Sequence, residues 1–214
     1  MKIFSSIKKK LDHILRLSGE RQVAPELGGI RKDHIGRYIF ACRFIKEGDV
    51  VLDCACGVGY GAYIMAEKTK LSNTIAVDKE RSAIKYARKY YFNPKIDYRV
   101  EDILSLDIAD DHFDVIVSFE TIEHVDGKKA VEIFHKMLKT GGLFIVSTPN
   151  QNKLVFNKKD FPFHLRHYTP EEFEELLSRS GFKIRNRVTQ YNRESEEVSE
   201  GWEGLYNIAV TEKI

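Results

Sequence analysis

Short apolar runs alternate with amphipathic segments along most of the chain. Runs that fit buried strands lie at 49–54, 73–78, 96–100, 113–118, 142–148, 182–190 and 205–211. Between them, apolar residues recur at helical spacing at 31–46, 60–70, 80–92, 127–139 and 170–180. Strands that alternate with helices form a mostly parallel sheet with helices on both faces. The pattern therefore predicts an α/β fold with seven strands in one sheet.

Cap and turn signals support a single domain. Thr169 followed by Pro170 combines an N-cap residue with proline at the first helical position. Residues 191–204 are polar and acidic, which predicts a loop between the last two strands. Because no repeat or long linker divides the chain, we expect one domain at 31–214 behind an N-terminal helical extension at 1–30.

The first 20 residues combine apolar positions at helical spacing with three lysines at 8–10. This pattern predicts an amphipathic basic helix, which we expect to pack on the domain. Peripheral contact with a membrane surface is the alternative, because basic amphipathic helices bind anionic lipids. The sequence shows neither an apolar run long enough to span a membrane nor a secretory signal pattern, so a cytoplasmic protein is expected.

Composition and charge restrict the class of partner. A chain of 214 residues can bury a sizeable core. Its 34 Lys and Arg residues nearly balance 32 Asp and Glu residues, and a net charge of +2 gives no reason to expect a polyanion as the main partner. The three cysteines lack the Cys-x-x-Cys spacing of redox pairs and zinc sites, which fits a reducing compartment.

A glycine-rich turn links the first predicted strand to a helix. The strand ends at Asp53, and Gly57, Gly59 and Gly61 follow before the helix begins. Glycines allow a tight turn and let a ligand approach the main chain without meeting a Cβ atom. The spacing differs from the Gly-x-Gly-x-x-Gly pattern of dinucleotide-binding proteins, and the Asp53 carboxylate would repel a pyrophosphate. A cationic ligand fits this turn better.

Acidic residues follow the next two predicted strands. Asp78 ends the second strand, where a carboxylate can accept hydrogen bonds from both hydroxyls of a ribose. After the third strand, Asp102 could accept from an adenine amino group while the amide of Ile103 reaches a ring nitrogen. Each aspartate alone is equally well explained as a turn or cap residue. Their order at successive strand ends favours an adenosyl site.

Five segments follow one another in a recognisable order: VVLDCACGVGYG, AVDKE, VEDI, FDVIVSFETIEHV and GGLFIVSTPN. In this order they resemble class I S-adenosylmethionine-dependent methyltransferases over nearly the whole chain. The resemblance implies a Rossmann-like methyltransferase fold at 31–214, in which the strand at 205–211 runs antiparallel near the sheet edge. It also implies S-adenosylmethionine as cofactor and methyl donor.

The resemblance assigns cofactor contacts to individual positions. The three glycines of the turn correspond to the loop around the methionine part, and Asp53 matches the aspartate at the strand end. Asp78 corresponds to the ribose contact, and its neighbour Lys79 is also predicted to contact the cofactor. Asp102 and the adjoining Ile103 correspond to the adenine contact.

Four further residues are assigned to the methionine part of the cofactor. Phe119 and Glu120 follow the fourth strand, where the resemblance implies backbone carbonyls that face the ammonium group. Arg37 could pair with the methionine carboxylate, because a guanidinium matches a carboxylate in a two-bond fork; a solvated surface arginine is the alternative. Tyr60 could pack over the methionine chain or simply begin the helix.

Histidines are the natural bases for methylation of a hydroxyl group. The acceptor atom must lie about 3 Å from the sulfonium carbon, and a hydroxyl must also lose a proton. His124 follows the fourth strand at the carboxyl edge, where open α/β sheets bind ligands. His164 lies in the segment 150–168, which could cover the acceptor pocket. We rank His124 before His164 as the candidate base. The alternative for His124 is a residue that begins a helix or supports the site.

No spacing of Asp and His residues predicts a metal site.

A narrower resemblance concerns the acceptor. Segments 20–21, 34–38 and 163–173 resemble methyltransferases of polysaccharide or other glycan synthesis, although 22–25 departs from their pattern. Ser-Phe-Glu-Thr at 118–121 replaces the Asn/Asp-Pro-Pro-Tyr type of sequence of many base-methylating relatives, so a nucleic acid acceptor is not expected. We predict transfer to a hydroxyl oxygen of a small molecule or glycan; N-methylation and a quinone-type acceptor stay open.

Two hypotheses from other functional classes compete with this one. An NAD-dependent oxidoreductase would carry the Gly-x-Gly-x-x-Gly fingerprint and would not need the second strand-end acid at Asp102. A non-catalytic adenosyl-binding protein would keep the pocket without turning over any acceptor. The complete set of motifs favours the enzyme.

Overall fold

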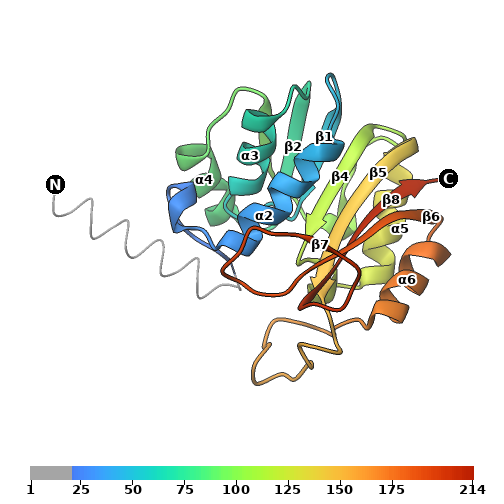
Figure 1. Ribbon diagram of the computed structural model, residues 1–214. Coiled ribbons are helices and arrows are strands. Elements are labelled where there is room, and N and C mark those ends of the chain that lie inside the picture. Colours follow the sequence, from blue (N-terminus) through green and yellow to red (C-terminus); the bar gives the residue numbers. More distant parts are fainter. Residues whose placement is uncertain (1–20) are drawn as a thin grey trace, which may run out of the picture.

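A single mixed sheet organises the molecule, and the computed structural model describes residues 21–214 (Figure 1). Its strands are β1 (Val50–Cys54), β2 (Asn73–Asp78), β3 (Ile96–Val100), β4 (Phe113–Phe119), β5 (Leu138–Pro149), β6 (Phe182–Gln190), β7 (Ser199–Glu200) and β8 (Tyr206–Lys213). Their spatial order is β3-β2-β1-β4-β5-β8-β6-β7. Strands β1 to β5 are parallel, and β8 runs antiparallel between β5 and β6. The predicted α/β fold, with an antiparallel strand near the sheet edge, is confirmed.

Helices cover both faces of the sheet (Figure 1). The α-helices are α2 (Lys32–Ala41), α3 (Tyr60–Lys68), α4 (Arg81–Tyr90), α5 (Gly127–Met137) and α6 (Pro170–Arg179). Short 3-10 helices are η1 (Leu27–Gly29), η2 (Cys42–Phe44), η3 (Ile103–Ser105) and η4 (Ile122–His124). Helices α2, α3 and α4 pack on one face, and α5 and α6 pack on the other.

The sequence prediction differs from the structure at two elements. The helix predicted at 31–46 ends as an α-helix at Ala41 and continues as the tighter η2, after which Ile45 is extended. The predicted loop at 191–204 contains β7, an eighth strand of two residues that pairs antiparallel with β6. A strand this short has no periodicity of its own, so only its pairing with β6 defines it.

The hydrophobic core follows from the alternation of side chains along each strand. Val51 and Val115 lie in the cluster beneath α2, α3 and α4, whereas their neighbours Leu52 and Ile116 lie in the cluster beneath α5 and α6. Successive strand residues point to opposite faces, so a strand covered on both sides must be apolar throughout. This explains why the central strands read as continuous apolar runs. Packing on both faces also holds the carboxyl ends of these strands in place.

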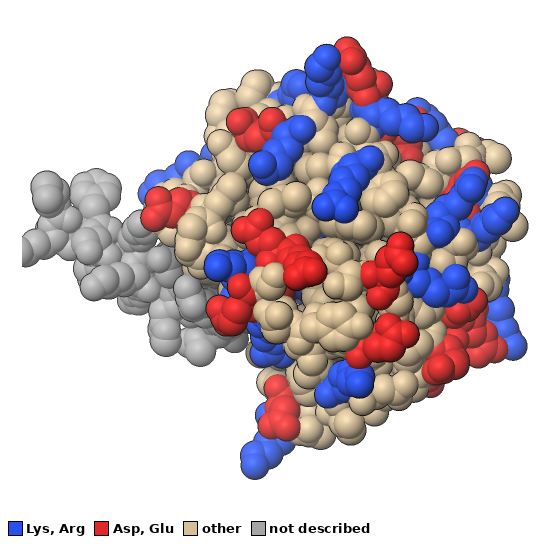
Figure 2. All heavy atoms as spheres, in the orientation of Figure 1, with Lys and Arg blue, Asp and Glu red and all other residues tan. Residues whose placement is uncertain are grey.

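Residues 21–30 pack against the domain. Val23, Ala24 and Ile30 are buried in the cluster under α2 and α3. The amphipathic helix predicted for the first 20 residues lies outside the described part of the chain. Among residues 21–214, no helix is long and apolar enough to cross a membrane. On the face shown in Figure 2, basic and acidic side chains are interspersed, so this face carries no extended field of one sign.

Candidate active site

A cavity of about 250 Å³ opens at the carboxyl edge of the parallel strands. It is lined by nine of the residues singled out in the sequence: Gly57, Tyr60, Asp78, Lys79, Asp102, Ile103, Phe119, Glu120 and His124. These residues come from the ends of β2 and β4 and from the segments that follow β1, β2, β3 and β4, because parallel strands present all their carboxyl ends at one edge. The structure therefore brings most of the predicted site together.

The glycines of the turn have different structural roles. Gly57 has a left-handed φ of +56°, lines the cavity and has open space where a Cβ would stand. Gly59 is the N-cap residue of α3, and a Cβ there would lie 2.6 Å from the Cβ of Ala87. A Cβ on Gly61 would lie 2.0 Å from the ring of Tyr38. Only Gly57 is therefore open to a ligand, whereas the other two let α4 and α2 pack closely.

Asp53 lies beneath the turn, buried behind the cavity wall. The Tyr38 hydroxyl donates to its Oδ1 at 3.0 Å, and within the described residues its Oδ2 has no hydrogen-bond partner. Burial raises the pKa of the Asp53 carboxyl to about 7, against the effect of the Tyr38 hydrogen bond. Tyr38 itself lines the cavity, so Asp53 acts on the cavity by holding Tyr38.

Asp78 is a buried carboxylate with several donors around it. Its Oδ2 accepts from the Gly57 amide at 3.0 Å, and its Oδ1 accepts from the Glu80 amide at 2.8 Å. The Arg21 guanidinium also donates to Oδ1 at 3.1 Å. Two carboxylate oxygens offer about four lone-pair directions. Arg21 therefore holds the position expected for a ribose hydroxyl and would have to shift when a ribose binds there.

The loop after β3 contributes the next acidic residue. Asp102 is exposed, and its Oδ1 accepts from the Leu104 amide at 2.9 Å, which caps η3. Ile103 is buried and lines the same cavity. Asp102 thus caps η3 and also lines the cavity. Its role as a cap residue therefore does not exclude the predicted contact with adenine.

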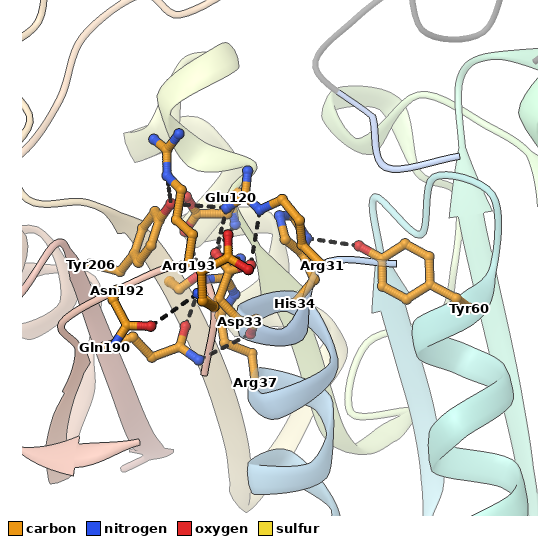
Figure 3. Close-up of polar contacts among 12 residues, drawn as sticks. Arg31, Asp33, His34, Arg37, Tyr60, Glu120, Gln190, Asn192, Arg193 and Tyr206 are labelled. Carbon is orange, nitrogen blue, oxygen red and sulfur yellow. Dashed lines mark hydrogen bonds and ion pairs between the residues drawn. The ribbon is translucent and has the colours of Figure 1, made fainter. Parts of the chain in front are cut away.

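His34 lines the cavity but was not among the predicted site residues, although it begins the segment 34–38 that carries the narrower resemblance. Its Nδ1 lies 2.9 Å from the Tyr60 hydroxyl (Figure 3). Burial and the charges of Arg37 and Arg31 hold the pKa of His34 well below its ordinary value, so the ring is neutral at physiological pH. His34 precedes Tyr38 by one helical turn, so both face the cavity from α2. This spacing of one helical turn could have indicated from sequence that His34 and Tyr38 share a helix face.

Arg37 does not line the cavity and is not positioned to meet a methionine carboxylate. Its side chain is buried between α2 and the last strands, where Nη1 donates to Gln190 Oε1 at 2.8 Å (Figure 3). Asp33 lies 3.8 Å from its Nη2, and the guanidinium stacks over the Tyr206 ring at 4.7 Å. Arg37 therefore ties α2 to β6 and β8.

A second cavity of about 430 Å³ adjoins the first. The two share lining residues, namely Arg21, Gln22, His34, Glu120 and His124. Its lining includes acids and imidazoles from η4 and the segment 150–168. It also includes Arg31, Arg193 and Tyr206, which together form its arginine wall. Two cavities that meet at shared polar residues can hold two reactants side by side.

Glu120 stands where the two cavities meet. It is a non-glycine residue with a left-handed φ of +51°, a conformation that persists only when surrounding contacts enforce it. Ser147 supplies these contacts: its Oγ donates to Glu120 Oε1 at 2.7 Å, and its carbonyl accepts from the Glu120 amide at 3.1 Å. Burial raises the pKa of Glu120. The tight turn directs the following η4 along the cavity wall.

His124, His164 and Glu123 cluster in the second cavity. The rings of His124 and His164 lie 4.4 Å apart between centroids. Glu123 is fully buried, and its Oε2 accepts from Thr148 Oγ1 at 3.1 Å. Burial and the neighbouring Glu120 charge raise the pKa of Glu123 well above its ordinary value. Forty residues of chain separate the two histidines, so no sequence spacing could have shown this cluster.

Comparison with known proteins identifies the family. A family model described as a methyltransferase domain matches residues 45–200. A probable S-adenosylmethionine-dependent methyltransferase from Mycolicibacterium smegmatis is 33% identical over 186 residues, which cover 83% of this chain and 69% of the relative. The chain belongs to the S-adenosylmethionine-dependent methyltransferases. The methyltransferase uses S-adenosylmethionine as its cofactor.

Two further matches bear on this methyltransferase. A phosphoethanolamine N-methyltransferase from Arabidopsis thaliana is 31% identical over 150 residues, 65% of this chain but only 30% of the relative. The crystal structure of a putative methyltransferase from Listeria monocytogenes has a TM-score of 0.69 at 16% identity, covering 85% of this chain and 99% of the other. At this identity the structural likeness shows the fold alone.

Proposed function

We propose that this methyltransferase transfers the methyl group of S-adenosylmethionine to a hydroxyl oxygen of a small-molecule or glycan acceptor. The observation that carries the proposal is the junction of the two cavities at Glu120 and His124, where the acceptor side is lined by imidazole and carboxylate groups. A hydroxyl is a weak nucleophile that must lose its proton. Imidazole and carboxylate groups can accept that proton.

The first cavity suits the cofactor. Asp78 would accept from the ribose hydroxyls once Arg21 shifts, and Asp102 and the Ile103 amide would meet the adenine edge. The main chain at Gly57 gives the methionine part close approach, because no Cβ fills that space. Glu120 places a carboxylate near the cationic end of the cofactor. The methyl group would then point toward the second cavity.

Proton removal would fall to the two histidines. His124 Nδ1 lies 3.1 Å from the Phe163 carbonyl, and His164 Nδ1 lies 2.7 Å from His167 Nε2. These contacts orient both rings, and both residues line the second cavity. A base held in this way accelerates proton transfer typically 10²- to 10⁴-fold.

The arginine wall favours an acceptor that carries an anionic group. Arg31 and Arg193 both donate to the Tyr206 hydroxyl, at 3.2 and 3.1 Å (Figure 3). Asp33 neutralises Arg31 in part, whereas Arg193 is exposed at the cavity rim. A phosphate or carboxylate on the acceptor would be attracted to this wall and would orient the hydroxyl toward the histidines.

N-methylation is a second candidate, favoured by the relatives named phosphoethanolamine N-methyltransferase. The arginine wall suits a phosphorylated amine as well as a phosphorylated alcohol. The two candidate reactions differ in how much they need the histidines as bases. A neutral amine attacks through its lone pair and depends less on a base than a hydroxyl does.

Tritiated S-adenosylmethionine offered with a panel of acceptors tests the proposal. The panel contains nucleotide sugars, phosphorylated and free monosaccharides, a hydroxyquinone and phosphoethanolamine. We expect label on a hydroxyl oxygen, at least about a hundredfold lower kcat in His164→Ala, and unchanged turnover in the control His112→Ala, an exposed histidine outside both cavities. Arg193→Ala should raise KM more than it lowers kcat. Label found only on nitrogen, or full turnover in His164→Ala, would contradict the proposal.

A further inference from the structure

We propose that Glu123, His124 and His164 form a binding site for a divalent transition-metal ion on the wall of the second cavity. One possible ligand atom of each side chain lies within 4.8 Å of those of the other two. All three residues line the cavity, so an ion held there would be accessible to an acceptor. The site itself is independent of the proposed methylation.

The fold holds the two halves of the cluster together. Glu123 and His124 belong to η4, directly after β4, whereas His164 lies in the long segment between β5 and α6. The Leu165 amide donates to the Glu123 carbonyl at 2.6 Å, and His124 Nδ1 contacts the Phe163 carbonyl. Backbone contacts on both sides of His164 therefore attach this segment to η4.

The hydrogen bonds of the rings determine which nitrogens carry lone pairs. A carbonyl oxygen only accepts, so His124 must donate to Phe163 through Nδ1–H, and in the neutral ring Nε2 carries the lone pair. His167 Nδ1 likewise donates to the Leu154 carbonyl, which makes His167 Nε2 an acceptor. His164 must then donate to it through Nδ1–H, leaving a lone pair on Nε2.

This arrangement is the one that metal-binding histidines require. A ligating imidazole donates its other N–H to a carbonyl or comparable acceptor, which orients the ring and raises its basicity. His124 meets this condition directly through Phe163. His164 meets it through His167 and, beyond it, Leu154. These contacts orient both rings at the cluster.

Glu123 supplies a buried carboxylate with one oxygen to spare. Thr148 Oγ1 donates to Oε2, whereas Oε1 has no hydrogen-bond partner among residues 21–214. The side chain is completely buried. An unpaired buried carboxylate oxygen is costly. A cation bound between it and the two imidazoles would remove that cost.

The ligand set indicates the class of ion. Two imidazoles and one carboxylate suit Zn²⁺, Fe²⁺, Co²⁺ or Mn²⁺, whereas Mg²⁺ prefers oxygen ligands alone. Zn–N and Zn–O bonds of about 2.0–2.2 Å place tetrahedral ligand atoms roughly 3.4 Å apart. The three side chains would therefore have to approach by up to about 1.5 Å from the present spacing.

The role of the ion rests on the proposed function. Three protein ligands leave at least one coordination position open, and it would face the acceptor cavity. An acceptor hydroxyl bound there would lose its proton to solvent water more easily, because the ion would stabilise the alkoxide that remains. In the metal-bound state the two imidazoles act as ligands, and the ion takes over the activation assigned above to a bare histidine.

Calorimetric titration of the untagged full chain with Zn²⁺ tests the site without any acceptor. We expect one ion per chain, and at least tenfold weaker binding in Glu123→Gln and in His164→Ala. The control is His112→Ala, which removes an exposed histidine outside the cluster. Binding of S-adenosylmethionine by each variant, through the first cavity, shows that it is folded. Substitution with Co²⁺ adds a visible absorption spectrum that should report two nitrogen ligands.

The outcomes separate the metal site from the proposed function. One tight Zn²⁺ that is lost in both variants but kept in the control supports the site, whether or not a methylated hydroxyl is ever found. Binding that is absent, or equally strong in Glu123→Gln and His164→Ala, overturns the site. A metal-free enzyme that methylates a hydroxyl and loses this activity in His164→Ala would leave the proposed function intact and overturn only the activating role assigned to the ion.

Discussion

Asp53 illustrates at the level of one residue how burial changes chemistry beneath the glycine turn. Burial raises its pKa to about 7 from an ordinary value of 3.8. The folded protein therefore binds this proton more tightly than the unfolded chain. The resulting stabilisation is fully present below about pH 4 and is lost as the pH rises through about 7.

Asp53→Asn should remove this pH dependence, because the amide keeps an acceptor for Tyr38 and carries no charge. Urea unfolding at pH 5 and pH 8 measures it. The variant should gain stability over the wild type at pH 8, by at most about 1.4 kcal/mol per unit of pKa shift, and much less at pH 5. Asp97→Asn, at an exposed residue of β3, is the control. Equal effects at both pH values would show that Asp53 is charged in the folded state.

At the same scale, the strand-end residues were predictable and their supporting partners were not. Asp78 and Asp102 stand at positions that the order of strands defines, so sequence alone placed them at the cavity. Arg37 was misplaced, because a guanidinium on a helix can face the cavity or the last strands and only packing decides which. His34 was missed because its partner, Tyr60, lies on another helix.

Helix α6 shows how local sequence defines an element. Thr169 Oγ1 accepts from the Glu172 amide at 3.2 Å, and Glu172 Oε2 accepts from the Thr169 amide at 2.9 Å, which completes a capping box. Thr169→Ala should cost about 1 kcal/mol of unfolding free energy. Denaturant unfolding measures this loss, with Ser178→Ala at an exposed position of the same helix as control. Equal losses in both variants would rule out the cap as the cause.

Elements that depend on local periodicity were predicted, and those that depend on distant partners were not. Among residues 21–214, the seven longer strands and five α-helices carry apolar runs or apolar residues at helical spacing, so their positions followed from sequence. Strand β7 exists only because Val188 and Thr189 of β6 pair with Glu200 and Ser199. Helix ends shifted by a few residues, as at Ala41, because the last turn tightens to fit the packing.

At the scale of the whole molecule, function arises where segments distant in sequence meet. The first cavity is built from strand ends whose relative position the α/β topology dictates, so the cofactor site could be anticipated. The second cavity combines α2, η4, the segment 150–168 and the last strand, and its shape depends on how these segments pack. Its arginine wall and its Glu123, His124 and His164 cluster therefore became visible only in the structure.

Calorimetric titration with S-adenosylmethionine measures whether the cavity at the carboxyl edge holds the cofactor through Asp78. We expect micromolar binding by the wild type and by Asp97→Asn, and a dissociation constant at least tenfold higher in Asp78→Asn, since a charge-assisted hydrogen bond contributes about 1.5–3 kcal/mol. Thermal unfolding confirms that each variant is folded. Equal affinity of folded Asp78→Asn and wild type would show that Asp78 does not hold the cofactor and would place it elsewhere.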